Sequence, residues 1–366
     1  MTSQTSVAAP SGVDNAPHPM RARALSHVVV IATILALLIV GVILSAGLGQ
    51  LTITPTEVIG SIVRAAGVDQ PWAPTDALIE KTLWQIRLPR VMMSLLVGAL
   101  LAVAGAVMQA VFANPLAEPG VVGVSSGAAL GAAIAIAGGW AALGTWSTAT
   151  FAFAGGLLAT VLVYVTARSG GRTESVTLIL TGIAVNAFAG AGLALLMFAG
   201  DAASREQIVF WQMGSLNGSR WSEVLLVAVV GVGAVIGVVA LGRQYDLLSL
   251  GDRSASHLGV RVERLRVISI ILVALLTGVA VAFVGIIAFV GLVVPHIVRM
   301  LLGPSTRTLL VVSFLLGATV LVYADLFART VVPAADLPIG ILTSIVGGPF
   351  FYWLLRRNRK RAGGWS

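Results

Sequence analysis

The sequence has no cysteine among its 366 residues. This absence excludes disulfide bonds, iron–sulfur clusters, thiolate zinc sites and cysteine nucleophiles. Charged residues are also scarce, at 10% of the chain, whereas a soluble domain carries about 25%. So few charges cannot cover the surface of a water-soluble protein, which all but excludes a soluble enzyme.

Several motifs that carry chemistry are missing. The only lysines are Lys81 and Lys360, and neither follows a glycine, so the chain has no phosphate-binding loop for ATP. The commonest metalloprotease and hydrolase signatures, HExxH and GxSxG, do not occur. The four histidines are scattered, and no pair has metal-ligand spacing on one helix. The sequence therefore predicts neither an enzyme nor a bound cofactor or metal.

Apolar residues dominate instead. They make up 57% of the chain, with a mean hydropathy of +0.97, and 41 glycines are spread through the apolar segments. These features predict an all-α polytopic membrane protein with ten transmembrane helices. The third and eighth segments are short or bounded by Gly and Pro, so we expect them to be tilted, broken or buried. The apolar segments lie near residues 28–48, 91–112, 119–137, 149–168, 176–200, 222–242, 267–284, 286–300, 308–328 and 338–355.

The distribution of basic residues predicts the orientation. With both termini in the cytoplasm, 16 of the 23 Lys and Arg residues fall inside and 7 outside, as the positive-inside rule requires. Topology thus explains the net charge of +8 better than nucleic-acid binding does. We expect residues 1–27 to be a disordered cytoplasmic tail, 28–357 to be the membrane domain, and 358–366 to be a basic cytoplasmic tail.

One cytoplasmic loop, 243–266, is longer than a connection needs. Its sequence predicts two short helices with a break at Gly251. Asp252 is the expected N-cap of the second helix and Gly259 its stop. Such a helical hairpin lies on the membrane face, either against a partner protein or on lipid.

Ionisable residues inside the membrane are limited to Asp325 and Arg329, spaced for an i,i+4 ion pair on the ninth segment. A proton-coupled secondary transporter needs an acidic relay at mid-membrane. A membrane-embedded enzyme needs a nucleophile, an acid or a metal cluster. The sequence offers neither, so an energy source outside this chain is the better hypothesis.

The stretch RLPRVMMSLLVGALLAVAGAVMQAVFANPLAEPGVVGVSSGAALG (87–131) closely resembles the permease subunits of ABC importers for iron chelates, heme and cobalamin. The resemblance continues in TGIAVNAFAGA (181–191), FWQMGSLNGSRW (210–221), FVGIIAFVGLVVPHIVRMLLG (283–303) and ADLPIGILTSIVGGPFFYWLLRR (335–357). It covers the chain from about residue 25 to 357, in order.

This resemblance implies a bacterial inner-membrane subunit of ten helices, in which helices 2–5 and 7–10 form an inverted pseudo-repeat. It further implies a homodimer with the translocation path between the two copies. Two ATP-binding subunits at the cytoplasmic face hold ATP and Mg²⁺, and a substrate-binding protein delivers the cargo from outside. No nucleic acid is among the implied partners.

Family positions carry over onto particular residues. Arg87, Arg90 and Arg329 match basic positions that engage acidic residues of the binding protein, although helix-start anchoring also explains the first two. Ser175 and Val176 match the cytoplasmic gate, and Asn186 faces either the cavity or another helix. Arg253 and Arg261 of the hairpin could pair with acidic groups of the ATPase. The loop that couples to the ATPase comprises Leu250, Gly251, Asp252, Arg253, Ser254, Ala255, Ser256, His257, Leu258 and Gly259.

The cargo is the least determined feature. The segments TGIAVNAFAGAGLALLMFAGD and FWQMGSLNGSRW look most like those of heme permeases, with ferric siderophore permeases close behind and cobalamin permeases third. No residue is an obvious ligand for heme iron, which fits a passage that does not hold its cargo.

Overall fold

The computed structural model describes residues 19–169, 172–173, 175–332 and 335–361, which are almost wholly helical, as the sequence predicts. The first elements are α1 (Pro19–Gly47), α2 (Pro55–Ala65), α3 (Ala77–Thr82), the π-helical turn η1 (Leu83–Arg87), α4 (Leu88–Val111), the 3-10 turn η2 (Pro119–Val122), α5 (Val124–Ala137), η3 (Trp140–Leu143) and α6 (Thr145–Ala167). The short antiparallel strands β1 (Arg168–Ser169) and β2 (Arg172–Thr173) follow. The remaining helices are α7 (Ser175–Ala199), α8 (Ala202–Met213), α9 (Trp221–Ala240), α10 (Gly242–Leu248), α11 (Asp252–His257), α12 (Val262–Val284), α13 (Val290–Leu302), α14 (Thr306–Thr330) and α15 (Ile339–Arg361).

Each of the ten predicted apolar segments corresponds to a helix. Within the described part of the chain, eight helices are long and apolar enough to cross a membrane, whereas α5 and α13 have 14 and 13 residues. A helix of that length spans about 20 Å, less than the roughly 30 Å of a bilayer core. Most residues of α5 and α13 are buried, as expected for the third and eighth segments, and the count of ten complete spans stays a prediction.

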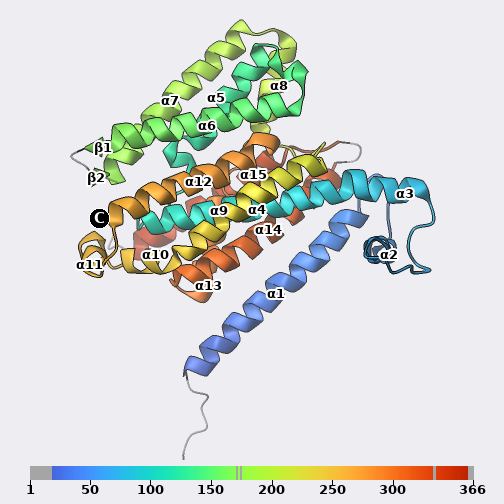
Figure 1. Cartoon of the computed structure of the whole chain (residues 1–366), viewed down its shortest axis with the longest axis horizontal. Coiled ribbons are helices and arrows are strands. Elements are labelled where there is room, and N and C mark those ends of the chain that lie inside the picture. Colours follow the sequence, from blue (N-terminus) through green and yellow to red (C-terminus); the bar gives the residue numbers. More distant parts are fainter. Residues whose placement is uncertain (1–18, 170–171, 174, 333–334, 362–366) are drawn as a thin grey trace, which may run out of the picture.

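The helix ends separate into two groups (Figure 1). The end with α10, α11, β1 and β2, called here the inner end, carries the loops predicted to be cytoplasmic. The opposite end, called the outer end, carries α2, α3 and α8. Helix α1 begins at Pro19 rather than near residue 28, so its first turns occupy part of the expected tail. The rest of that tail, and residues 362–366 at the other terminus, lie outside the described residues.

Helix α4 is the centre of the packing. Its apolar span is 89% buried, and it contacts α9, α12, α13 and α14. Two crossings place backbone directly against backbone: a Cβ at Gly98 would overlap the carbonyl of Gly317, and one at Gly105 would overlap that of Gly291. Small residues at helix crossings are the usual means of close packing in membranes. Helices α5, α6 and α7 form a neighbouring group that contacts the rest mainly through α12.

Candidate functional site

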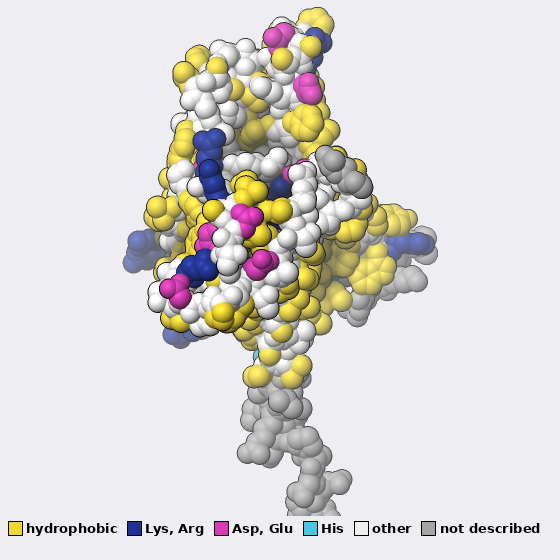
Figure 2. All heavy atoms as spheres, turned by 90° about the vertical axis from the view of Figure 1, so that its right-hand side faces the viewer, with side chains coloured by type: hydrophobic (Ala, Val, Ile, Leu, Met, Phe, Trp, Pro, Cys, Tyr) yellow, Lys and Arg dark blue, Asp and Glu magenta, His cyan; other side chains and the backbone are white. Residues whose placement is uncertain are grey.

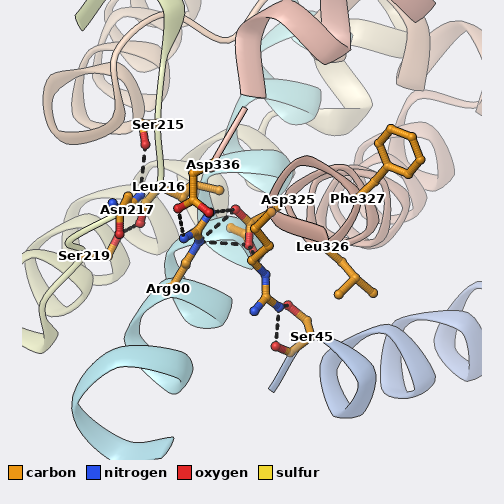
Figure 3. A network of polar contacts seen from close by, with 12 residues as sticks. Ser45, Arg90, Ser215, Leu216, Asn217, Ser219, Asp325, Leu326, Phe327 and Asp336 are labelled. Carbon is orange, nitrogen blue, oxygen red and sulfur yellow. Dashed lines mark hydrogen bonds and ion pairs between the residues drawn. The ribbon is translucent and has the colours of Figure 1, made fainter. Parts of the chain in front are cut away.

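A buried charge cluster lies at the outer end, where α4 and α14 meet the segment before α15. Arg90 donates from Nε to Asp325 at 3.0 Å and from Nη1 to Asp336 at 2.7 Å. Arg329 approaches the other Asp325 oxygen at 3.4 Å, which confirms the predicted i,i+4 pair. Figure 3 shows Arg90 between the two carboxylates. The Asp325 side chain is only 1% exposed, so its charge depends on both arginines.

Two arginines, Arg87 and Arg329, donate hydrogen bonds to the backbone at the outer end of α1. Arg87, in the π-helical turn before α4, donates to the carbonyls of Leu48 and Leu51. Arg329 donates to the carbonyls of Ser45 and Leu48, and to the Ser45 hydroxyl at 2.7 Å. The bonds to Ser45 and Leu48 satisfy carbonyls that the end of a helix leaves without partners, and the bond to Leu51 holds the segment that follows α1. Arg87 thus links the start of α4 to the end of α1, whereas its anchoring at the membrane interface stays a prediction.

The structure brings the three predicted docking arginines together but buries them. Arg87 is 7% exposed, and the side chains of Arg90 and Arg329 are 11% and 6% exposed. Asp336, whose side chain is 34% exposed, is the most accessible member of the cluster and was missed by sequence reasoning. The surface of the outer end carries exposed charges of both signs, with hydrophobic surface at its flanks (Figure 2).

The predicted helical hairpin is present at the inner end as α10 and α11, with the break at Gly251 (φ 95°). One detail was wrong: Gly251, not Asp252, is the N-cap, and Asp252 begins α11 and pairs with Arg266 at 2.9 Å. Nine of the ten predicted coupling residues are exposed, with Leu250 at 61% and Leu258 at 58%. Ala255 is fully buried, so it packs beneath the exposed face of the hairpin.

Polar contacts hold the hairpin against the membrane helices. The buried hydroxyl of Tyr245 in α10 lies 2.8 Å from that of Ser269 in α12, and burial raises the pKa of Tyr245 to about 12. Asp246 accepts a hydrogen bond of 2.7 Å from the backbone N–H of Thr306, at the start of α14. Together with the pair between α11 and α12, these contacts tie both short helices to two membrane spans.

A cavity of about 530 Å³ lies between α5, α7 and α8. Asn186 of α7 lines it and also contacts neighbouring segments: it accepts a hydrogen bond from Ser126 at 2.5 Å and donates to the carbonyl of Gly120 at 3.3 Å. Asn186 therefore contacts neighbouring segments, as one of the two alternatives expects, and its place on the translocation path stays a prediction. Of the predicted gate residues, Ser175 begins α7, and Val176 is 68% exposed. Their role as the gate stays a prediction.

Glu118 also lines this cavity, half-buried, from the segment between α4 and α5. Burial raises the pKa of its carboxyl above the ordinary value. Sequence reasoning missed Glu118, although an acidic residue between two apolar segments was the available signal. Among the residues that the structure describes, no group of His, Asp and Glu side chains is placed to hold a metal ion.

Comparisons with known proteins agree on one family. The sequence profile of the FecCD transport family matches residues 37–357. The hemin transport system permease HmuU of Yersinia pestis is 42% identical over 282 residues, 76% of this chain and 84% of that protein. The cobalamin import permease BtuC of Halobacterium salinarum is 43% identical over 278 residues, 76% of this chain and 74% of that protein.

Solved structures support the fold. A metal-chelate type ABC transporter in an inward-facing conformation matches with a TM-score of 0.79 and 32% identity, over 90% of this chain and 99% of that one. The PsaBC complex of Streptococcus pneumoniae has a TM-score of 0.51 at 18% identity, over 72% of this chain and 89% of that one. The second likeness extends to the fold alone.

Proposed function

The chain belongs to the FecCD transport family and is a permease of an ABC importer, and from this premise we propose that it moves an iron complex into the cytoplasm. Heme is the preferred cargo and a ferric siderophore the second, with cobalamin the alternative. The permease works as a homodimer in the bacterial inner membrane. A binding protein delivers the cargo at the outer end, and two ATPase subunits act at the inner end.

The observation that supports coupling to an ATPase is the α10–α11 hairpin, which is exposed to a partner and held by polar contacts against the membrane helices. Leu250 and Leu258 project apolar surface from a segment that already lies outside the spans. The small residues Ser254 and Ser256, both exposed, allow a partner's backbone to approach closely. Because contacts from α10 and α11 reach α12 and the start of α14, a displacement of the hairpin moves membrane helices rather than a free loop.

Docking of the binding protein involves the outer charge cluster. The cluster contains three positive charges, on Arg87, Arg90 and Arg329. It contains two negative charges, on Asp325 and Asp336, so its net charge is positive. A carboxylate of the binding protein exchanges most easily with Asp336, since that side chain is partly exposed and Asp325 is not. Charge pairs at such a rim orient a partner more than they strengthen its binding.

The translocation path runs along α7 and α15, with a second copy of the chain supplying the opposite wall. Helix α7 buries only 17% of its apolar span within one copy, which leaves a broad surface for a partner and for lipid. Ser175 and Val176, at the inner end of α7, form the cytoplasmic gate. Asn186 and Glu118 supply polar groups to an otherwise largely apolar cavity beside α7.

The cargo is tested by the ATPase activity of the permease–ATPase complex in lipid nanodiscs. The binding protein is added empty or loaded with heme, a ferric siderophore or cobalamin. We expect the heme-loaded form to stimulate ATP hydrolysis most. Preferential stimulation by another cargo rejects heme but retains the importer, whereas cargo uptake by the permease without any ATPase supports a secondary transporter and refutes the proposal.

The matched control for coupling uses the hairpin. Leu258→Asp places a charge on the exposed face and is expected to abolish stimulation while the permease stays folded. Ser249→Asp is the control, because Ser249 is exposed at the end of α10 but lies outside the predicted coupling loop. Equal loss of stimulation in the Leu258 and Ser249 variants contradicts the assignment.

A further inference from the structure

A second cavity, of about 570 Å³, opens at the inner end between α10, the turn after α11 and the first turns of α12. Helix α9 ends at Ala240 and α12 begins at Val262. The cavity therefore lies where two membrane spans end, at the boundary between bilayer and water. It is lined by Leu241, Arg243, Gln244, Leu247, Leu258, Gly259, Val260, Arg261, Arg264, Leu265 and Ile268.

Three arginines surround the cavity, and all three are exposed. Arg243 lies at the start of α10, Arg261 immediately precedes α12, and Arg264 lies in the first turn of α12. Within the described parts of the chain, no carboxylate lies within ion-pair distance of any of them. Three positive charges therefore line one cavity, and no carboxylate in the described parts of the chain pairs with them.

The neighbouring acidic side chains are already engaged. Asp252 pairs with Arg266 at 2.9 Å, and Asp246 accepts from the N–H of Thr306 at 2.7 Å. Glu263 also has an interaction partner. The positive-inside rule explains why arginines lie at this end, but not why three of them converge on one cavity while the nearby acids are occupied elsewhere.

Apart from Gln244, the remaining side chains that line the cavity are apolar. Leu241, Leu265 and Ile268 contribute hydrocarbon side chains to its wall. One turn beyond Ile268, Ile271 is 50% exposed on α12. Apolar surface therefore continues from the cavity along a membrane-spanning helix. A basic mouth joined to an apolar surface at the membrane boundary matches the two halves of a phospholipid.

We propose that this cavity binds an anionic phospholipid of the inner leaflet. The phosphodiester lies among Arg243, Arg261 and Arg264, and the acyl chains extend past Ile268 along α12 into the bilayer. The bound lipid joins α10 to α12 beside Leu258, which lines the cavity and also belongs to the exposed face of the hairpin. The proposal does not depend on the cargo or on transport, because its ligand is the bilayer itself.

The test is native mass spectrometry of the full-length chain, delipidated in detergent and titrated with phosphatidylglycerol or phosphatidylcholine of identical acyl chains. We expect the anionic lipid to bind at least tenfold more tightly than the zwitterionic one. Each Arg→Gln substitution should weaken binding about fivefold, since a basic residue near a charged lipid surface contributes about 1 kcal/mol. The triple variant R243Q/R261Q/R264Q should therefore lose roughly 100-fold.

The matched control removes the same number of charges at the same end. Arg253, Arg307 and Arg356 are exposed but do not line the cavity, so R253Q/R307Q/R356Q should retain binding within threefold. Replacing the three cavity arginines with lysine preserves the charge and should restore most of the affinity. Unchanged melting temperatures, followed by tryptophan fluorescence, separate loss of the site from loss of the fold.

Three results overturn the proposal. The first is equal affinity for the two lipids, and the second is equal loss in the cavity and control variants. The third is displacement of the anionic lipid by the ATPase subunit or by millimolar inorganic phosphate, because the cavity then serves an acidic group of the partner protein or a free anion.

Discussion

Breaking the outer charge cluster tests the packing of this permease most sharply. Asp325 is 1% exposed and lies 2.9 Å from Arg90. Removing one member of a buried ion pair leaves its partner's charge uncompensated and costs about 3–5 kcal/mol. We therefore expect Arg90→Gln and Asp325→Asn each to lower the free energy of unfolding by an amount in this range.

The double substitution should cost much less than the sum of the two single substitutions. With both charges removed, neither position 90 nor position 325 carries an unpaired charge, although Arg329 and Asp336 each lose one ion pair. Residues in contact show coupling energies of about 0.5–3 kcal/mol. We expect a coupling near the upper end of this range, because the Nε of Arg90 donates to both oxygens of Asp325 and its Nη2 lies 2.9 Å from Oδ1. The measurement is a double-mutant cycle of unfolding in mild detergent, followed by the fluorescence of the eight tryptophans.

Arg64 provides the control. It lies 3.7 Å from Asp69, which is 95% exposed, and 3.9 Å from Glu80, and it donates to the carbonyl of Pro74 at 2.9 Å. Because its own side chain is 35% exposed, Arg64→Gln should cost about 1 kcal/mol, well below the cost of Arg90→Gln. Strictly additive costs at Arg90 and Asp325, or an Arg90→Gln cost no larger than that of the control, would refute the claim that the cluster acts as one buried unit.

The remaining predictions concern packing, protonation and coupling. Gly105→Ala should prevent stable folding, because the added methyl group overlaps the backbone of α13. Gly190→Ala places its methyl group in open space and should change the free energy of unfolding by no more than about 1 kcal/mol. Thermal unfolding measures both variants. Tyr245, whose pKa is raised to about 12, should stay protonated in the folded chain at pH 11. Because unfolded tyrosine ionises near pH 10, the free energy of unfolding should fall as the pH rises from about 10 to 12. Absorbance at 295 nm should show one tyrosine fewer ionised in the folded chain than after unfolding. Leu250→Asp, at an exposed site, should reduce co-purification of the ATPase without lowering the melting temperature, whereas Ala255→Asp, at a buried site, should lower it.

Much of the fold could be predicted because it follows from local sequence. Hydropathy located all eight helices that, in the described part of the chain, are long and apolar enough to cross a membrane. The pair of Asp325 with Arg329 followed from helical spacing alone. Gly251 marked the break in the hairpin correctly. The N-cap was misassigned because an Asp is the commoner cap, while here the glycine adopts a positive φ that places Asp252 inside the first turn.

The contacts between distant segments could not be predicted. Arg90 meets Asp325 across 235 positions of sequence, and no local pattern pairs them. The proximity of Glu118 and Asn186 could not be predicted either, because they share a cavity only through the packing of the segment after α4 beside α7. The family resemblance identified the three arginines as a set, but only the packing shows that their guanidinium groups already have partners within the chain.

The most direct test of the account is ATP-dependent uptake of cargo into proteoliposomes that contain the permease, its ATPase and a loaded binding protein. We predict uptake that requires ATP and the binding protein and that is lost in Leu258→Asp while the variant remains folded. Uptake that continues without ATP, or that is undiminished in Leu258→Asp, would contradict the claim that the α10–α11 hairpin transmits the work of a separate ATPase to this permease.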